Sequence, residues 1–319
     1  MRPDYTEDFY EARRKGAQKS AKAIVPLVLE LIQPRSVIDV GCGSGSWLSV
    51  FKECGVSDVL GLDGDYVDRG MLEIPEEQFL AVDLTNPLKI DRQFDLVVSL
   101  EVAEHLPRKY ARTLVNSLTR LGPVILFSAA IPFQEGTNHL NEQWPEYWVR
   151  LFEKEGYVVL DPIRKNIWRN DNVEFWYIQN ILMFIQQNYL ESNLVLRKEF
   201  ESTNRHLLSI VHPKLFLEVR QKYKIHREKA EYYIAEAEKY KAETQAHKEK
   251  AEYYIAEAEK YKAETRAYKE KAEDYVAEVE RYKAKAEPRN MSLKEVVKAL
   301  PTVVVSTIRR RGEKLFSRT

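Results

Sequence analysis

The sequence predicts an α/β domain with a doubly wound parallel sheet, followed by a long coiled-coil helix. Short apolar runs alternate with helical patterns through the first half of the chain, and one run ends in a glycine-rich loop. A 21-residue repeat in the second half predicts the coiled coil. We therefore expect an α/β domain at 1–187, a helical connector at 188–221, a coiled coil at 222–287 and a basic amphipathic tail at 288–319.

The elements of the first segment are predicted in chain order. Residues 17–33 have the apolar spacing of an amphipathic helix, and a second helix is expected from Pro145, a favoured first-turn residue, to just before Gly156. Five short apolar runs predict parallel strands: Ser36–Val40, Asp58–Leu62, Phe79–Val82, Asp95–Leu100 and Val124–Ser128. Tyr157–Asp161 and Glu174–Ile185 are expected as a final pair of strands.

Charge is distributed unevenly along a chain whose formal net charge is zero. Residues 1–221 hold 25 basic and 31 acidic side chains, residues 222–287 hold 16 of each, and residues 288–319 hold 8 basic and 2 acidic. The acidic first part makes nucleic acid the less favoured partner, because a phosphate track needs a basic face. With two cysteines, no apolar signal core and no membrane-spanning run, a cytoplasmic protein is expected.

Residues 227–247 and 248–268 are nearly identical copies of one unit, and a third, diverged copy runs to Glu287. The period is three heptads, which place small residues at position a and tyrosines at position d. The a positions are Ala230, Ala237, Thr244, Ala251, Ala258, Thr265, Ala272 and Val279, and the d positions are Tyr233, Tyr240, His247, Tyr254, Tyr261, Tyr268, Tyr275 and Tyr282. This seam predicts a left-handed coiled coil, a homo-oligomer through residues 222–287 and a rod on the order of 100 Å long. A solvated single helix held by Glu–Lys pairs is the alternative.

The tail combines a helix-capping pattern with apolar and basic residues. Ser292–Glu295 is a capping box, and apolar residues flank Arg309, Arg310 and Arg311. Such a segment favours an anionic membrane surface or a glycosyltransferase partner through residues 292–319, which would hold the protein on the inner face of the cell membrane. The alternative is a frayed tail that only increases solubility.

The apolar run Val37–Val40 leads through the glycine loop Gly41–Gly45 into a predicted helix. Glycines let the backbone approach a ligand closely, and a helix N-terminus attracts anionic groups. Asp63 ends the next strand, where an acid would hydrogen-bond the two hydroxyls of a ribose. The glycines follow D-x-G-x-G-x-G, because Ser46 stands where the dinucleotide pattern G-x-G-x-x-G has its third glycine. The loop therefore predicts an adenosine-containing ligand.

Four blocks in order resemble the class I S-adenosylmethionine-dependent methyltransferases over about residues 15–185. The blocks are Asp39–Gly45, Gly61–Asp63, Ala81–Leu84 and Phe94–Ser99. The resemblance implies a Rossmann-like seven-stranded sheet with an antiparallel last strand, and S-adenosyl-L-methionine as cofactor. It implies that Asp63 holds the ribose and Asp83 lies beside the adenine amine, although Asp83 could instead be a turn residue. The expected cofactor-binding residues are Asp39, Gly41, Cys42, Gly43, Gly45, Asp63, Asp83 and Ser99.

Two acids and a histidine, Glu101, Glu104 and His105, lie within five residues after the fourth predicted strand. Strand ends of such a sheet face the ligand crevice, so these side chains could bind a divalent ion with His139 of a later loop. The E-x-x-E-H pattern with a later histidine is similar to ubiquinone-biosynthesis O-methyltransferases and small-RNA 3′-end 2′-O-methyltransferases. That likeness implies that Glu101, Glu104, His105 and His139 hold Mg, Mn or Zn, which would lower the pKa of a coordinated hydroxyl.

Each of these residues has a second interpretation. Glu101 could contact the cofactor, and Glu104 could cap a helix that starts near Pro107. His105 could be a general base without a metal, and His139 could be an ordinary loop histidine. We expect His105 and Glu104 to be the catalytic residues.

The predicted coiled coil and basic tail indicate which class of acceptor to expect. A methyltransferase joined to a coiled coil and a basic tail resembles bacterial polysaccharide-modifying methyltransferases, although this chain lacks the kinase domain of the best-known examples. We expect a metal-assisted O-methyltransferase acting on a sugar hydroxyl of a cell-surface glycan or its precursor. The alternatives are methylation of an RNA 2′-hydroxyl, methylation of a quinone-like small molecule, and a coiled-coil scaffold whose domain only binds ligand.

Overall fold

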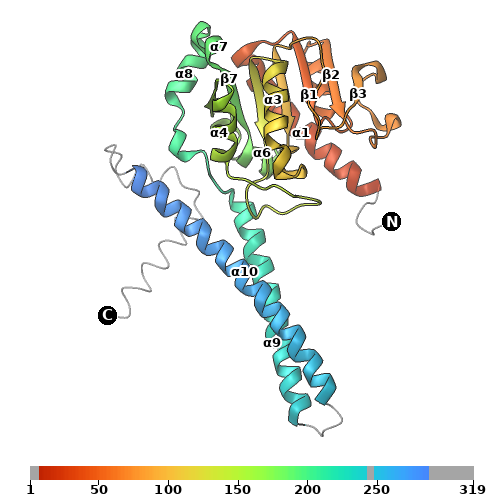
Figure 1. Ribbon diagram of the computed structural model, residues 1–319, viewed down its shortest axis with the longest axis vertical. Coiled ribbons are helices and arrows are strands. Elements are labelled where there is room, and N and C mark those ends of the chain that lie inside the picture. Colours follow the sequence, from red (N-terminus) through yellow and green to blue (C-terminus); the bar gives the residue numbers. More distant parts are fainter. Residues whose placement is uncertain (1–6, 243–247, 287–319) are drawn as a thin grey trace. The chain divides into compact units, whose positions relative to one another are not determined.

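The computed structural model describes residues 7–242 and 248–286, in two compact units divided after Ile210 (Figure 1). The first unit holds a seven-stranded sheet with the order β3-β2-β1-β4-β5-β7-β6. The strands are β1 (Ser36–Val40), β2 (Asp58–Asp63), β3 (Phe79–Ala81), β4 (Leu96–Leu100), β5 (Val124–Ser128), β6 (Tyr157–Leu160) and β7 (Leu182–Gln186). β1 to β5 are parallel, and β7 runs antiparallel to both β5 and β6. The expected sheet, with its antiparallel last strand, is confirmed.

Helices cover both faces of the sheet. Along β4, Val98 packs into a core shared with α1 and α2, whereas its neighbour Val97 packs into a second core shared with α3 and α4. Successive strand side chains point to opposite faces, so strands that are apolar at every position require helices on both sides. The α-helices of this unit are α1 (Glu7–Ile32), α2 (Ser46–Glu53), α3 (Ala111–Leu121), α4 (Pro145–Lys154), α5 (Arg164–Ile167), α6 (Phe175–Asn180), α7 (Gln187–Ser192) and α8 (Leu194–Ser202). Short 3₁₀ turns are η1 (Arg69–Met71), η2 (Glu76–Gln78), η3 (Ala103–His105), η4 (Arg108–Tyr110) and η5 (Arg205–Leu207).

The expected strand Glu174–Ile185 is wrong over its first half. Phe175–Asn180 form the helix α6, and only Leu182–Gln186 form β7. The run is apolar almost throughout, and a continuous apolar run has no periodicity that separates a buried helix from a buried strand. α6 buries Tyr177 and Ile178 in the core shared with α1 and α2, which leaves its last residue, Asn180, at the end of the turn before β7.

The expected connector at 188–221 is divided between the two units. α7 follows β7 directly, and α8 packs against α1 and β6 of the first unit. The second unit begins at Val211 and contains α9 (Pro213–Ala242) and α10 (Lys248–Ala286). None of the helices within the described ranges is both long enough and apolar enough to cross a lipid bilayer.

α9 and α10 lie side by side and antiparallel, as a helical hairpin (Figure 1). The predicted a positions Ala230, Ala237, Ala251 and Ala258 are all buried between them, and a left-handed coiled coil stays a prediction. Tyrosines at position d stack across the seam, with ring centroids of Tyr233 and Tyr254 5.7 Å apart. The expected single rod on the order of 100 Å is wrong for this structure, because the chain folds back and buries the seam against itself.

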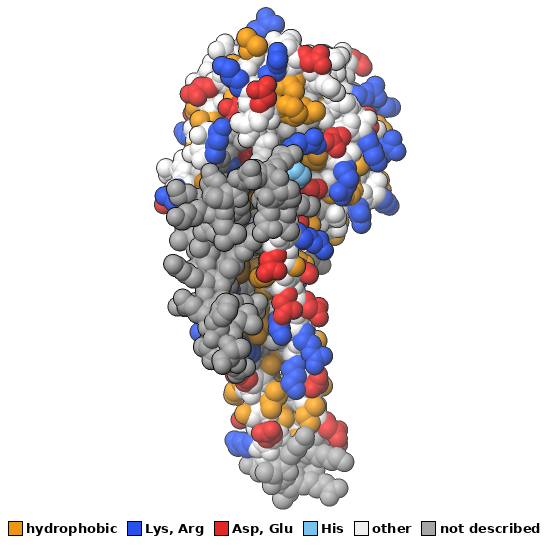
Figure 2. All heavy atoms as spheres, turned by 90° about the vertical axis from the view of Figure 1, so that its left-hand side faces the viewer, with side chains coloured by type: hydrophobic (Ala, Val, Ile, Leu, Met, Phe, Trp, Pro, Cys, Tyr) orange, Lys and Arg blue, Asp and Glu red, His pale blue; other side chains and the backbone are white. Residues whose placement is uncertain are grey.

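The outward surface of the hairpin carries charge of both signs. Figure 2 shows acidic and basic side chains interspersed with apolar ones along the described part of these helices. Some form ion pairs along one helix, such as Lys224 Nζ with Glu228 Oε1 at 3.7 Å and Arg227 Nε with Glu231 Oε1 at 3.5 Å. Such exposed pairs add a few tenths of a kcal/mol each, so burial of the seam stabilises the hairpin more than these pairs do. The predicted tail at 288–319, with Ser292–Glu295, lies outside the described residues.

Candidate active site

The glycine loop joins β1 to α2 at the carboxyl edge of the sheet. Gly41 has φ of +86°, and a Cβ placed there would lie 2.3 Å from Cγ2 of Val102, so both the conformation and the space require glycine. Gly43 also has a positive φ, +55°, but a Cβ there would meet nothing within 4 Å. The loop therefore packs tightly on one side and leaves the backbone of Gly43 open to a ligand.

Asp63, at the end of β2, fastens this loop. Its Oδ2 accepts a hydrogen bond from the Gly43 N–H at 2.7 Å, and its Oδ1 accepts from the Gly64 N–H and the Tyr66 hydroxyl, each at 2.6 Å. Burial and the hydrogen bond to Asp63 raise the pKa of Tyr66, so this hydroxyl stays protonated and donates. The structure thus joins Asp63 to the glycine loop, and a ribose contact by Asp63 stays a prediction.

A second acid lies beneath the loop. Asp39 on β1 is 2% exposed, and burial, followed by the negative charge of Asp63, raises its pKa well above the usual range. Burial and the charges of Asp39 and Asp63 also raise the pKa of the Cys42 thiol, which is therefore not a nucleophile here. Two acids this close favour a positively charged ligand, and S-adenosylmethionine carries a sulfonium and an ammonium group.

Two expected cofactor residues use their side chains elsewhere. Asp83 is exposed and accepts hydrogen bonds from the Thr85 N–H, the Thr85 hydroxyl and the Asn86 amide at 2.9, 2.7 and 2.8 Å. These bonds are those of a turn, and the bonds from Thr85 lower the pKa of Asp83. Ser99 is fully buried and donates to the Val40 carbonyl at 3.0 Å, which ties β4 to β1. A cofactor contact by either residue stays a prediction.

A carboxylate that the sequence did not single out also contacts the loop. Glu73 accepts hydrogen bonds from the hydroxyls of Ser46 and Ser44 at 2.6 and 3.3 Å, at the start of α2. From α1, the Gln18 amide donates to Glu73 at 3.3 Å, and Arg14 Nε lies 3.8 Å from Glu73 Oε1. The first helix is therefore attached to the glycine loop through one acid.

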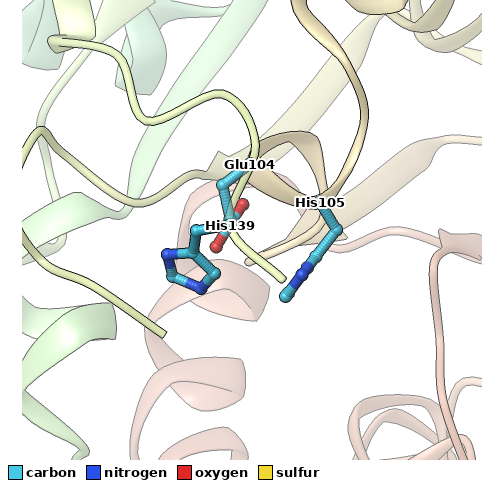
Figure 3. A group of neighbouring side chains, drawn as sticks. All are labelled: Glu104, His105 and His139. Carbon is cyan, nitrogen blue, oxygen red and sulfur yellow. The ribbon is translucent and has the colours of Figure 1, made fainter. Parts of the chain in front are cut away.

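Three of the four expected metal ligands form a cluster. Potential ligand atoms of Glu104, His105 and His139 all lie within 4.8 Å of one another, and the three side chains converge in Figure 3. Glu104 and His105 come from η3, just after β4, and His139 comes from the loop after β5. The imidazole rings of His105 and His139 meet edge to face, with centroids 5.0 Å apart.

The buried environment of Glu104 is the strongest indication that this cluster binds a cation. Its side chain is fully buried, and neither carboxylate oxygen has a hydrogen-bond partner among the described residues. Burial raises its pKa well above the usual range and the charge of Glu101 raises it further, while weaker interactions with the backbone N–H groups of Glu104 and Ala130 oppose the shift. A buried, unpaired carboxylate is costly, and a divalent ion held with two imidazoles would stabilise it. One oxygen donor and two nitrogen donors suit Mn or Zn, and Mg less well.

His139 is oriented by a residue that sequence reasoning missed. Its Nδ1 lies 2.9 Å from Oε1 of Glu142, and the other oxygen of Glu142 accepts a hydrogen bond from the Phe133 N–H at 2.7 Å. With its Nδ1–H donated to Glu142, a neutral imidazole presents the lone pair of Nε2 to a ligand. Metal-binding histidines commonly have such an acidic partner. The signal in the sequence was an acid three residues after a candidate ligand.

Glu101 lies next to Glu104, and a network of amides holds its carboxylate. It accepts hydrogen bonds from Gln134 at 3.0 Å and from Asn180 at 3.0 Å, and Gln179 donates to Gln134 at 3.0 Å. Burial raises the pKa of Glu101, although the hydrogen bonds from Asn180 and Gln134 oppose this. Its φ of +55° is uncommon for a residue other than glycine and is typical of functional sites. A role for Glu101 as metal ligand stays a prediction.

Packing connects the glycine loop to the amide network. Trp47, the second residue of α2, meets Tyr177 of α6 edge to face, with ring centroids 5.2 Å apart. α6 ends at Asn180, which holds Glu101. The short helix α6 therefore connects the glycine loop with the amide network that holds Glu101.

Comparison with known proteins agrees with this geometry. Residues 10–167, which include both the glycine loop and the cluster, match the protein family described as Methyltransferase domain. No curated protein sequence matches the chain. The chain is similar to the solved sugar N-methyltransferase KedS8 from Streptoalloteichus sp ATCC 53650, with 16% identity over 57% of this chain and 93% of that one and a TM-score of 0.45.

Two other solved structures are similar at the same level. The methyltransferase domain of bacterial CtHen1 is 20% identical over 53% of this chain and 98% of that one, with a TM-score of 0.39. CalS10, an amino pentose methyltransferase from Micromonospora echinaspora, is 14% identical over 59% of this chain and 100% of that one, with a TM-score of 0.43.

Proposed function

We propose that this S-adenosylmethionine-dependent methyltransferase, whose residues 10–167 match the methyltransferase domain family, methylates a sugar hydroxyl with the help of a divalent ion. The acceptor would be a cell-surface polysaccharide or its precursor. The observation that carries the proposal is the cluster of Glu104, His105 and His139, in which a buried, unpartnered carboxylate faces two imidazoles. The match to a methyltransferase family disfavours the alternative of a non-catalytic scaffold.

One group of residues would bind the methyl donor, and a second group would bind the ion. Asp63 and the open backbone at Gly43 would bind the ribose of the donor, and Asp39 would face its positive charge. Glu104, His105 and His139 would hold the ion, which when bound lowers the pKa of a coordinated hydroxyl and orients it. Fixing donor and acceptor in line removes much of the barrier to a bimolecular transfer.

The proton of the acceptor hydroxyl would be removed at the cluster of Glu104, His105 and His139. The acceptor hydroxyl must lose a proton as its oxygen attacks the methyl group, and an imidazole accepts protons near neutral pH. Without an ion, a ring nitrogen of His105 would accept this proton, with Glu104 as the adjacent acid. With the ion bound, the lone pair of His105 serves as a ligand, and the coordinated hydroxyl, whose pKa the ion lowers, would release its proton to water. His139, held by Glu142 at 2.9 Å, keeps a fixed orientation and would serve as a ligand.

The acceptor class follows from the donor set and from charge. An oxygen-and-nitrogen site for a hard or borderline ion suits neighbouring hydroxyls, as in a sugar diol. Residues 1–221, with 31 acidic and 25 basic side chains, disfavour a polyanion, so a glycan is preferred over RNA. RNA 2′-O-methylation is the second candidate, because a terminal ribose presents the same diol, and a quinone-like phenol is the third.

A transfer assay with matched acceptors tests the proposal. The full chain would be incubated with methyl-labelled S-adenosylmethionine, MnCl₂ or EDTA, and either a glycan with terminal vicinal diols or an RNA oligonucleotide. Each acceptor would be paired with its periodate-oxidised form, which lacks the diol. Label on the intact glycan alone, lost in EDTA, would support the proposal. Label on intact RNA would favour the second candidate, and label that survives EDTA would refute metal assistance.

Two partner proposals accompany this function. We propose that the chain forms a homo-oligomer through residues 222–287, and that residues 292–319 bind a membrane surface or a glycosyltransferase. The first is supported by the tyrosine seam. The second is supported by the basic and apolar composition of the tail, where 8 basic residues stand against 2 acidic ones in residues 288–319.

A further inference from the structure

The two helices of the hairpin are made largely of two copies of one sequence. Residues 228–244 and residues 249–265 are identical, so each residue of the first copy has an equivalent 21 positions later. Tyr233 and Tyr254 are such equivalents, and their rings stack on each other at 5.7 Å. A contact between equivalent positions is the mark of a two-fold axis.

One further pair of ring contacts obeys the same symmetry. Tyr233 stacks on Tyr261 at 5.6 Å with an interplanar angle of 12°. The contact that a two-fold axis would generate from it joins Tyr240 to Tyr254, and it is present at 5.6 Å with an angle of 10°. The hairpin seam is therefore isologous, in that each copy of the repeat packs against a surface identical to its own.

The junction between the helices has the sequence of a helix interior. Residues 243–247 read ETQAH, and their equivalents Glu264–Tyr268 read ETRAY and lie within α10. The junction contains no glycine or proline, the residues that most often mark turns. Thr244 and His247 also continue the heptad at positions a and d, so the seam pattern runs through the junction without a break.

We propose that two copies of this chain exchange their hairpin helices and pair through the same seam. Each segment 213–286 would be one continuous helix, and Tyr233 of one copy would stack on Tyr254 of the other. An isologous seam forms between two chains with the contacts it makes within one, and a helical junction removes the need for a turn. The occupant of this surface is therefore a second copy of the chain.

The exchange would change the size of the molecule in a measurable way. A continuous helix over residues 213–286 would be about 110 Å long, at 1.5 Å per residue. Because the two helices run antiparallel, the methyltransferase units of the dimer would lie at opposite ends of the rod. The closed hairpin competes, since a short junction gives the two copies of one chain a high effective concentration. The fraction of chains in the dimer should therefore increase with protein concentration.

The test is sedimentation equilibrium of the full chain over a wide concentration range. We expect a monomer–dimer equilibrium for the wild type, with small-angle scattering that shows the elongated dimer. The double variant Thr244→Gly, Gln245→Gly should weaken the dimer about 10- to 100-fold, because the continuous helices of the dimer would hold four interior glycines, which are poorer helix formers than the residues they replace. Circular dichroism would establish that the variant keeps its helices.

Two tyrosine variants test whether hairpin and dimer share one seam. Tyr233→Ala should lower the melting temperature of the helices but leave the monomer–dimer constant nearly unchanged, because its stacking on Tyr254 is lost equally from the hairpin and from the dimer. Tyr232→Ala should change neither quantity, because Tyr232 is 59% exposed on the outer surface. A wild type that stays monomeric at every concentration would overturn the proposal. A dimer that tolerates both junction glycines would overturn it equally, since that dimer would use another surface.

Discussion

The hydrogen bond between Glu142 and His139 offers the sharpest test of the proposed metal site. In Glu142→Gln the side chain keeps its shape but has one acceptor oxygen, whereas Glu142 accepts from both His139 Nδ1 and the Phe133 N–H, at 2.9 and 2.7 Å. One of the two donors must lose its partner. A hydrogen bond to a charged group contributes about 1.5–3 kcal/mol, and loss of an acidic partner of a metal-binding histidine typically costs 10–100-fold in affinity.

We therefore expect Glu142→Gln to weaken Mn²⁺ binding about 10-fold or more, measured by calorimetry with S-adenosylhomocysteine present. Affinity for S-adenosylhomocysteine itself should not change, because Glu142 lies on the loop after β5 and not on the glycine loop. Glu146→Gln is the matched control, since it removes the same charge four residues away, where Glu146 accepts from the Ser209 hydroxyl. Equal Mn²⁺ affinity in wild type and Glu142→Gln would refute the reasoning.

Three further predictions concern residues on both sides of the site. Gly41→Ala should lower the free energy of unfolding by about 2–4 kcal/mol in urea titrations, because it adds left-handed backbone strain and places a Cβ 2.3 Å from Val102. Gly43→Ala should lower it by only about 1 kcal/mol and should chiefly weaken S-adenosylhomocysteine binding, because a Cβ there meets no neighbouring atom. Asp63→Ala should weaken that binding at least 10-fold by calorimetry, and an unchanged Kd would remove Asp63 from the site. Burial raises the pKa of Glu104 in the folded state, so from pH 4.5 upward the unfolded chain releases this proton more readily than the folded one, and the wild type loses stability. Metal-free Glu104→Gln should therefore gain in melting temperature over wild type from pH 5 to 8, and parallel curves would contradict this.

The sheet and the cofactor loop could be predicted because their signals are local. Runs such as Val37–Val40 are apolar at nearly every position, which is typical of a strand covered on both faces. The loop after it combines glycine spacing with Asp63, and the structure joins them through a 2.7 Å hydrogen bond. The proximity of Glu104, His105 and His139 could also be expected, since strand ends of a parallel sheet share one edge, but their role as ligands stays a prediction.

The parts that the sequence did not reveal depend on contacts between distant residues. The apolar run over 174–185 hid the helix α6, and with it the amide of Asn180 that holds Glu101. Glu142 and Glu73 are polar loop residues whose partners cannot be read from spacing. The hairpin was missed because the heptads continue through residues 243–247, where a turn would ordinarily interrupt them.

The contact between Trp47 and Tyr177 has a thermodynamic consequence. Trp47 follows the glycine loop, and Tyr177 belongs to the same short helix as Asn180, so a donor that shifts the start of α2 also shifts the group that holds Glu101. Donor and ion would then bind with a shared coupling free energy, and linkage requires each to change the affinity of the other by the same factor. Because an indole lies at this junction, its fluorescence would report the occupancy of both halves of the site.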